Sequence, residues 1–380
     1  MFMPVYLDNA ATTRPCPEAV AAITDCLTEN YGNASSLHGA GVAAWQAVNE
    51  ARKTVARALS CEPERIVFTS GATESNNLAL FGAARARRRR GNRIVTTAVE
   101  HPSVGVALSA LEKDGFEVVR IGVGPDGLFD ADAFEAAVDE NTILCSCMLV
   151  NNETGAVLPV GRLFGGVKRR FPEVVTHCDA VQAFGKLPVS PGRLSADLLS
   201  VSGHKLHAAK GVGVLYIAKD TRIPPMLYGG GQERGMRPGT ESVPLIAGFG
   251  AAVRTALPHM KENLAHCEDL RAYTLERLAE HPEVVPLSTG DCSPYILSLA
   301  VPGVRSEIML HFLESEGVYV SSGSACSKGK KSGVLGAFGH SDAVADTAIR
   351  VSFSRFSTRE DVDALAAAIG HGLERFRHIG

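Results

Sequence analysis

The sequence predicts an α/β protein with a mostly parallel central sheet in a large domain and a smaller α+β domain. Two observations carry this prediction. Apolar runs of strand length alternate with helical patterns between residues 65 and 217, and a mixed pattern replaces the alternation after about residue 225. Strands that are apolar throughout are typical of parallel sheets, because helices cover both faces. The length of 380 residues is enough for two domains.

Two helices are expected before the alternation begins. Residues 17–29 start with a proline, which fits the first turn of a helix. Residues 40–59 carry apolar side chains at helical spacing, which predicts an amphipathic helix. The apolar positions of that second helix are Val42, Trp45, Val48, Val55 and Leu59.

The alternating region predicts strands and helices in turn. The expected strands are residues 65–69, 93–97, 117–121, 142–150, 174–178, 198–202 and 213–217. The expected helices between them are residues 73–90, 102–114, 130–138 and 161–171. The last strand follows closely behind its predecessor, and we therefore expect it to run antiparallel.

A different organisation is expected after residue 225. A glycine-rich loop, with glycines in 229–231 and 235–239, leads into one long helical region over 243–280. Strand or helix patterns follow at residues 295–301, 305–316, 318–321, 348–353 and 358–376. We therefore predict a large domain over 16–257 and a small domain made of 1–15 plus 258–380.

Composition excludes several classes of protein. The chain has 38 Lys and Arg against 41 Asp and Glu, which argues against a dedicated nucleic-acid binder. The basic run at 85–90 reads as a solvated helix end, with an acidic or RNA partner as the alternative. No apolar run approaches the roughly 20 residues that span a bilayer. The nine cysteines lack metal-ligand spacing, and without a signal segment we expect a cytoplasmic protein with reduced thiols and no metal site.

The first chemically informative stretch is Ser70-Gly71-Ala72-Thr73, between a predicted strand and a predicted helix. Glycine permits a close turn, and the hydroxyls lie beside helix N–H groups, an arrangement that can hold a phosphate. Taken alone, the stretch is more typical of an ordinary helix cap. It lacks both the Walker pattern and the dinucleotide-binding glycine pattern.

Two further residues follow predicted strands. Asp179 ends one strand, and Lys205 follows another within Ser202-Gly203-His204-Lys205. Alone, the first could cap a helix and the second could be a solvated charge, with Lys186 and Lys210 as nearby competitors. Together with a phosphate-binding helix end, they are the parts of a pyridoxal-phosphate site: a Schiff-base lysine and a carboxylate for the pyridinium nitrogen. His101 could stack on the ring or serve a structural role.

Cys326 is the best candidate for a reactive thiol. It lies in a stretch of small residues at 321–327, and Lys328, Lys330 and Lys331 follow. Small residues predict a mobile loop, and nearby cations favour the thiolate. Cys145 and Cys147 lie inside an apolar strand and are expected in the core.

In combination these motifs closely resemble the pyridoxal-phosphate-dependent cysteine desulfurases, of the fold-type I, class V aminotransferase family. The resemblance covers nearly the whole chain, from residue 6 to residue 353. The matching motifs are YLDNAATT at 6–13, SGATESNN at 70–77, EH at 100–101, NNETG at 151–155, DAVQ at 179–182, SGHK at 202–205, GGGQERGMRPGT at 229–240 and SSGSACS at 321–327. The last motif is similar to that of the group with a long cysteine loop.

The resemblance implies roles for the cofactor-binding residues. Lys205 would carry pyridoxal 5'-phosphate, Asp179 would pair with its ring nitrogen, Gln182 would lie near its phenolic oxygen and His101 would stack on its ring. The phosphate would be held by Ala72, Thr73, Ser202 and His204, and by Thr240 from the other subunit of a homodimer.

The resemblance also implies the reaction. Arg350, helped by Asn152, would bind the carboxylate of L-cysteine, and Cys326 would take its sulfur, leaving L-alanine and a persulfide. An iron–sulfur scaffold or a tRNA-thiolation enzyme would accept the sulfur, without direct contact to nucleic acid or membrane. The alternative is another class V enzyme, an aminotransferase or a cysteine or selenocysteine β-lyase, in which Cys326 is dispensable. A non-catalytic binding protein is a third possibility, and failure to take up the cofactor would favour it.

Overall fold

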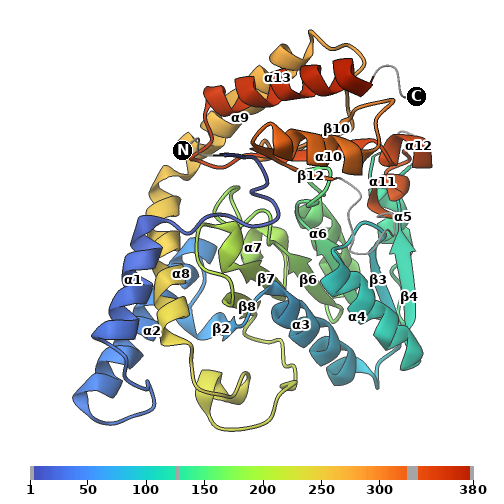
Figure 1. Ribbon diagram of the computed structural model, residues 1–380. Helices are drawn as coiled ribbons and strands as arrows, with labels where there is room; N and C mark the ends of the chain where they lie inside the picture. Colours follow the sequence, from blue (N-terminus) through green and yellow to red (C-terminus); the bar gives the residue numbers. More distant parts are fainter. Residues whose placement is uncertain (1–3, 125–127, 289, 323–332, 377–380) are drawn as a thin grey trace.

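The computed structural model describes residues 4–124, 128–288, 290–322 and 333–376. Its centre is a seven-stranded sheet in the order β2-β8-β7-β6-β5-β3-β4 (Figure 1). The strands are β2 (Ile66–Thr69), β3 (Arg93–Thr97), β4 (Glu117–Ile121), β5 (Thr142–Met148), β6 (Val175–Asp179), β7 (Leu198–Ser202) and β8 (Gly213–Ile217). The run from β4 to β7 is parallel, and β8 is antiparallel to both neighbours, which confirms the predicted arrangement.

Helices cover this sheet, and all but the short one at Pro191–Leu194 lie close to where the sequence predicts them. They are α1 (Pro17–Thr28), α2 (Gly39–Leu59), α3 (Ala72–Arg87), α4 (Pro102–Lys113), α5 (Ala131–Ala136), α6 (Val160–Arg170), α7 (Pro191–Leu194) and α8 (Val243–Ala256). Both α1 and α2 pack against α8. The apolar face expected on α2 is only partly correct, because Val48, Val55 and Leu59 are buried but Val42 and Trp45 are 44% and 56% exposed.

Smaller sheets lie beyond the seven-stranded sheet, with α9 (Met260–Leu278), α10 (Ser306–Ser315) and α13 (Arg359–Phe376) beside them at the top of Figure 1. One sheet has the antiparallel order β12-β13-β10-β9, and the other pairs β1 with β11 in parallel. Their strands are β1 (Val5–Tyr6), β9 (Val285–Pro286), β10 (Ile296–Ala300), β11 (Val318–Tyr319), β12 (Ser321–Ser322) and β13 (Ala348–Ser352). Short helices α11 (Gly333–Ala337) and α12 (Asp342–Ala345) complete the order.

The long helical region expected over 243–280 is confirmed, but it is not one continuous α-helix. A 3-10 turn, η4 (Leu257–His259), separates α8 from α9. Pro258 lies inside that turn, and a proline has no N–H with which to continue a helical ladder. The division into domains near residue 258 stays a prediction.

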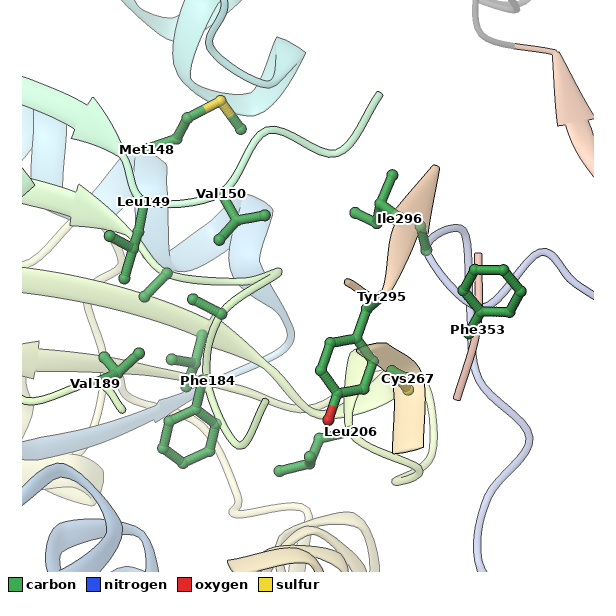
Figure 2. Close-up of a cluster of buried hydrophobic side chains, with 14 of the residues drawn as sticks. Met148, Leu149, Val150, Phe184, Val189, Leu206, Cys267, Tyr295, Ile296 and Phe353 are labelled. Atoms are coloured by element: carbon green, nitrogen blue, oxygen red, sulfur yellow. The ribbon is translucent and has the colours of Figure 1, made fainter. Parts of the chain in front are cut away.

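Two features bring the smaller sheets to the ends of the central strands. A buried apolar cluster joins the end of β5 and the segment after β6 to β10 and β13, with Met148, Phe184, Tyr295 and Phe353 among its members (Figure 2). The N-terminal segment pairs through β1 with β11 and then continues toward Lys205. Both features fix the small sheets relative to the carboxyl ends of the parallel strands, where ligands bind in such sheets.

Candidate active site

A cavity of about 640 Å³ lies at the carboxyl ends of β5, β6 and β7. Its walls include most of the residues that the sequence analysis singles out: Ala72, Thr73, His101, Asn152, Asp179, Gln182, Ser202, His204, Lys205 and Arg350. Ser321 and Ser322 of β12 also line it. Thr240 is exposed and does not line this cavity. Cys326 lies outside the described residues.

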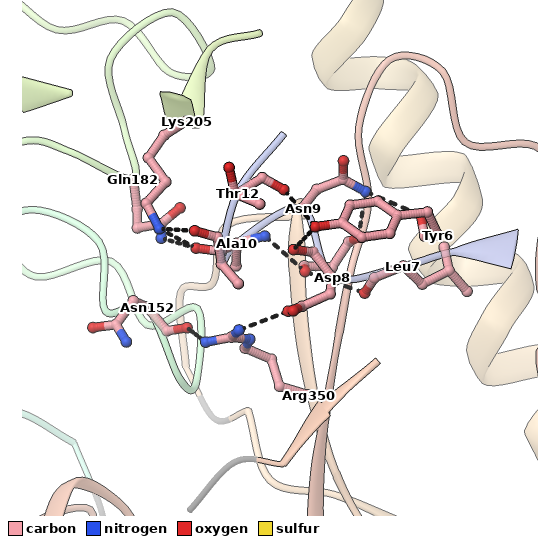
Figure 3. Close-up of polar contacts among 12 residues, drawn as sticks. Tyr6, Leu7, Asp8, Asn9, Ala10, Thr12, Asn152, Gln182, Lys205 and Arg350 are labelled. Atoms are coloured by element: carbon pink, nitrogen blue, oxygen red, sulfur yellow. Dashed lines mark hydrogen bonds and ion pairs between the residues drawn. The ribbon is translucent and has the colours of Figure 1, made fainter. Parts of the chain in front are cut away.

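Lys205 is held by the N-terminal segment. It ends the 3-10 turn η2 (Gly203–Lys205) directly after β7. Its Nζ donates hydrogen bonds of 2.6 Å to the carbonyl oxygens of Ala10 and Ala11 (Figure 3). Burial, reinforced by Lys186 and Arg350, lowers the pKa of the Lys205 amine to about 7. A considerable fraction of this amine is therefore uncharged at neutral pH.

Asp179 is a buried carboxylate with fixed orientation. It is 4% exposed, and its two oxygens accept hydrogen bonds from Asn76 Nδ2 at 2.8 Å and from the Val181 N–H at 3.0 Å. Both donors are neutral, so the carboxylate remains available to a cation. A buried carboxylate without a cation is costly unless it has such donors.

His101 has one ring nitrogen fixed by Ser103. The Ser103 N–H donates to Nδ1 at 3.1 Å, and the Ser103 hydroxyl lies 2.8 Å from the same nitrogen. An acceptor at Nδ1 assigns the proton of the neutral ring to Nε2. Burial, with Lys205 adding to it, lowers the pKa of His101, which favours this neutral form at pH 7.

The beginning of α3 forms one wall of the cavity. The N-cap residue of α3 is Gly71, which has no side chain that could accept a hydrogen bond from the first turn. The ordinary side-chain cap that the sequence allowed is therefore not formed at this position. A Cβ on Gly213 would lie 2.7 Å from the Cα of Gly71, and this close approach holds the turn against β8. The helix end faces the cavity and is suited to bind an anion.

His204 lies near this end of the cavity as a neutral ring. Burial, followed by the charges of Lys205 and Lys210, lowers its pKa to about 4. Its Nδ1 is 3.2 Å from the hydroxyl of Thr12. The residue can therefore exchange hydrogen bonds with a ligand at neutral pH without carrying a charge.

Arg350 reaches the cavity from β13. Its Nη1 donates to the carbonyl oxygen of Asn152 at 2.9 Å, and its Nη2 pairs with Asp8 at 2.8 Å (Figure 3). Its Nε has no hydrogen-bond partner within the described part of the chain although it is buried. A guanidinium with unused N–H groups beside a cavity is a ready site for a carboxylate.

Sequence reasoning missed several residues that support this site. Asn76 and Asp8 lie within quoted motifs, but nothing in their spacing indicates that they contact Asp179 and Arg350. Glu100 is buried beside His101, and its Oε1 accepts from the Thr97 hydroxyl and the Met148 N–H. Burial, followed by the charge of Asp179, raises the pKa of Glu100 to about 8.

The residues present fit pyridoxal phosphate. An uncapped helix end for a phosphate, a buried carboxylate for a ring nitrogen and an amine of lowered pKa line one cavity. Across the described residues, no cluster of His, Cys, Asp and Glu suits a metal ion. No helix in that same part of the chain is long and apolar enough to cross a membrane.

Comparison with known proteins agrees with this fit. The family model described as aminotransferase class-V matches residues 5–365. The chain is 40% identical to a cysteine desulfurase IscS of Methylococcus capsulatus, over all of this chain and 94% of that protein. It is 37% identical to a NifS/IcsS protein homolog of Lactobacillus delbrueckii, over 99% and 98% of the two chains.

A solved structure described as a NifS-like protein superposes with a TM-score of 0.93 at 37% identity, covering 98% of this chain and 100% of that one. The expected fold is therefore confirmed. The match spans the central sheet, the strand-end cavity and the smaller sheets alike, and the chain belongs to the class V aminotransferase family.

Proposed function

We propose that this protein is a pyridoxal-phosphate-dependent cysteine desulfurase that converts L-cysteine to L-alanine and leaves a persulfide on Cys326. One observation carries the proposal: Lys205, Asp179 and Arg350 line a single cavity, and so does the β12 strand that leads into the Cys326 segment. The names of the relatives, at up to 40% identity over nearly the whole chain, support the same activity.

The cofactor would be held by residues from several elements. Asp179 would face the ring nitrogen, His101 the ring, and Gln182 the phenolic oxygen. The α3 end with Ala72, Thr73, Ser202 and His204 would take the phosphate. When bound, the cofactor supplies an electron sink for the electrons released at the substrate Cα.

Lys205 serves as the proton carrier at the substrate Cα. An amine with a pKa near 7 is matched to the operating pH, which is the condition for efficient general acid–base catalysis. The carbonyls of Ala10 and Ala11 accept from its Nζ, so the amine keeps one orientation while it is not bonded to a ligand.

Arg350 orients the substrate by its carboxylate. The planar guanidinium can bind two carboxylate oxygens at once, and Asp8 and the carbonyl of Asn152 keep its plane fixed. Both contacts are made within the protein, so the arginine is held in place before substrate arrives. Pre-orientation of this kind lowers the entropic cost of reaching the reactive geometry.

Cys326 is proposed to receive the sulfur. Its thiolate attacks the substrate sulfur, a sulfur–sulfur bond forms, and the substrate Cβ–S bond breaks. The electron pair from that bond is protonated at Cβ, so L-cysteine and one thiol become L-alanine and one persulfide. A sulfur-acceptor protein, such as an iron–sulfur scaffold or a tRNA-thiolation enzyme, would then take the persulfide sulfur.

The activity is tested by incubating the cofactor-loaded protein with L-cysteine and a reductant. We expect equal amounts of alanine and sulfide, and no turnover by Cys326→Ser. The matched control is Cys61→Ser, because burial raises the pKa of Cys61 to about 11 and makes it a poor nucleophile. Pyruvate as product, or full activity in Cys326→Ser, would instead indicate the β-lyase alternative, and transfer of the amino group would indicate an aminotransferase.

The working unit is proposed to be a homodimer. Large apolar side chains are exposed on α2 and the segment before it, with Leu37 98%, Trp45 56% and Tyr31 75% exposed. The glycine-rich loop is anchored within its own chain, since Glu233 pairs with Arg52 at 2.8 Å. Thr240 follows this anchor and is exposed, which supports its reaching the site of a second copy.

We place the enzyme in the cytoplasm. Cys16, Cys145, Cys147, Cys178 and Cys267 are buried unpaired thiols. Unpaired thiols are typical of a reducing compartment.

A further inference from the structure

Lys186 is a buried lysine close to the cavity that the mechanism above does not use. It is 6% exposed and belongs to the turn that follows Gln182. Its ammonium lies 5.5 Å from the centre of the Tyr295 ring. Tyr295 lies in the apolar cluster with Cys267 and Leu206 (Figure 2). A buried lysine in such surroundings calls for a specific partner.

That partner is the side-chain amide of Gln182. The Lys186 Nζ donates to Gln182 Oε1 at 3.2 Å, and Gln182 Nε2 donates to the carbonyl oxygen of Ala10 at 2.9 Å (Figure 3 includes the second contact). An ammonium can only donate and a backbone carbonyl can only accept. The two neighbours therefore demand the same orientation of the amide, with oxygen toward Lys186 and nitrogen toward Ala10.

We propose that Lys186 is a positioning residue, whose buried ammonium fixes the Gln182 amide so that its NH₂ group, and not its oxygen, is presented to the cavity. Gln182 and Ala10 line the cavity, whereas Lys186 stands behind them. The inference rests on the proposed function, in which Gln182 faces an oxygen of the cofactor. A donor attracts that oxygen, and a flipped amide would repel it.

The local backbone explains how a lysine comes to lie here. Gly185 has φ +72°, and a Cβ on it would lie 2.5 Å from a methyl carbon of Leu206. Only glycine fits this turn, which brings Lys186 beside the residue that follows Lys205.

The titratable groups around Lys186 come from three elements and one adjoining residue. They are Cys267 on α9, Arg350 on β13, Lys205 and His204 on η2, and His207 just after η2. Burial lowers the pKa of Lys186 to about 8, with Arg350 adding to the effect. Lys186 is thus mainly protonated at pH 7 and donates a charge-assisted hydrogen bond there.

The test is a double-mutant cycle that measures the affinity of the cofactor-free protein for pyridoxal phosphate by absorbance titration at pH 7. We expect Lys186→Met and Gln182→Leu each to weaken binding about tenfold, the size expected for one misplaced hydrogen bond. The double variant should bind no more weakly than Gln182→Leu alone. Additive losses would overturn the proposal, because they would mean that Lys186 acts without Gln182.

A second variant, Lys186→Gln, tests the proposal even if Lys186→Met folds poorly. Its side-chain amide can still donate toward Gln182 but, unlike an ammonium, can also accept, so we expect binding between that of wild type and that of Gln182→Leu. Binding as weak as that of Gln182→Leu would overturn the proposal, because a retained donor would then restore none of the amide's orientation. Lys219→Met, at an exposed turn, is the matched control. Alanine formation by the wild type is measured separately, so a failed function and a failed positioning role are distinguishable.

Discussion

The carboxyl ends of β6 and β7 differ from the outer face of α2 in which side chains they bury and which they expose. At the strand ends, polar groups are buried and have partners within one chain: Asp179 bonds to Asn76, and Lys205 bonds to two carbonyls. On α2, Trp45 and Val42 are apolar yet roughly half exposed. The floor of the cavity is therefore built by one chain, whereas the α2 face is where we propose that a second copy binds, because burial of apolar surface is favourable.

The largest effect is expected at the strand ends. Lys205→Ala removes the only proton carrier we assign to the substrate Cα and should lower alanine formation by at least about a thousandfold. The measurement is alanine produced per enzyme under saturating L-cysteine. Lys219→Ala, on an exposed turn, should match the wild type. Activity of Lys205→Ala within tenfold of wild type would remove the amine from the mechanism.

A second strong effect is expected at Arg350. Arg350→Lys keeps the charge but loses the planar fork and the paired contacts to Asp8 and Asn152. We expect KM for L-cysteine to rise by about a hundredfold, as for the loss of a bidentate charge-assisted pair. Arg305→Lys, at an exposed position, is the control. A fall in kcat with an unchanged KM would contradict a role in carboxylate binding.

The α2 face offers a test of the other half of the comparison. Trp45→Glu places a charge in the proposed interface and should weaken self-association by about a hundredfold or more. Sedimentation velocity at micromolar concentration should then find dimers for wild type and mostly monomers for the variant. Val106→Glu changes an exposed apolar residue on α4 and should stay dimeric. If the wild-type protein bound the cofactor as a monomer, the proposal that Thr240 of a second copy completes the site would be refuted.

The smallest effect concerns Glu100 behind the cavity. Its pKa in the folded protein, about 8, lies above the ordinary value of a glutamate. The stability that its protonated form contributes is thus fully present in acid and is lost as the pH rises through about 8. Glu100→Gln removes this titration, so between pH 6 and pH 9 its Tm should fall less than that of wild type, by about 2 °C or more.

The measurement is thermal unfolding of the cofactor-free protein, and Glu280→Gln at an exposed turn should follow the wild type. Parallel curves for Glu100→Gln and wild type would mean that Glu100 is already ionised in the folded protein. The strand ends would then hold a second buried charge beside Asp179.

The sequence predicts well where the central strands lie and which residues follow them. It predicts poorly which distant side chains contact those residues. The apolar runs indicate the central strands, and the residues that follow them, such as Asp179 and Lys205, lie at the cavity as expected. Local patterns do not reveal that Asn76 contacts Asp179, 103 positions away, or that Asp8 contacts Arg350, 342 positions away. They also do not separate a buried face of a helix from an exposed apolar one, because Trp45 and Val48 follow the same helical spacing but only Val48 is buried.

The most direct test of the central claim is a single turnover without reductant. The cofactor-loaded protein is mixed with L-cysteine, alanine is quantified, and added sulfur is mapped by mass spectrometry of peptides. We predict one alanine per active site and one extra sulfur on the peptide that carries Cys326. Pyruvate in place of alanine, or extra sulfur on any other cysteine while Cys326 stays unmodified, would contradict the account.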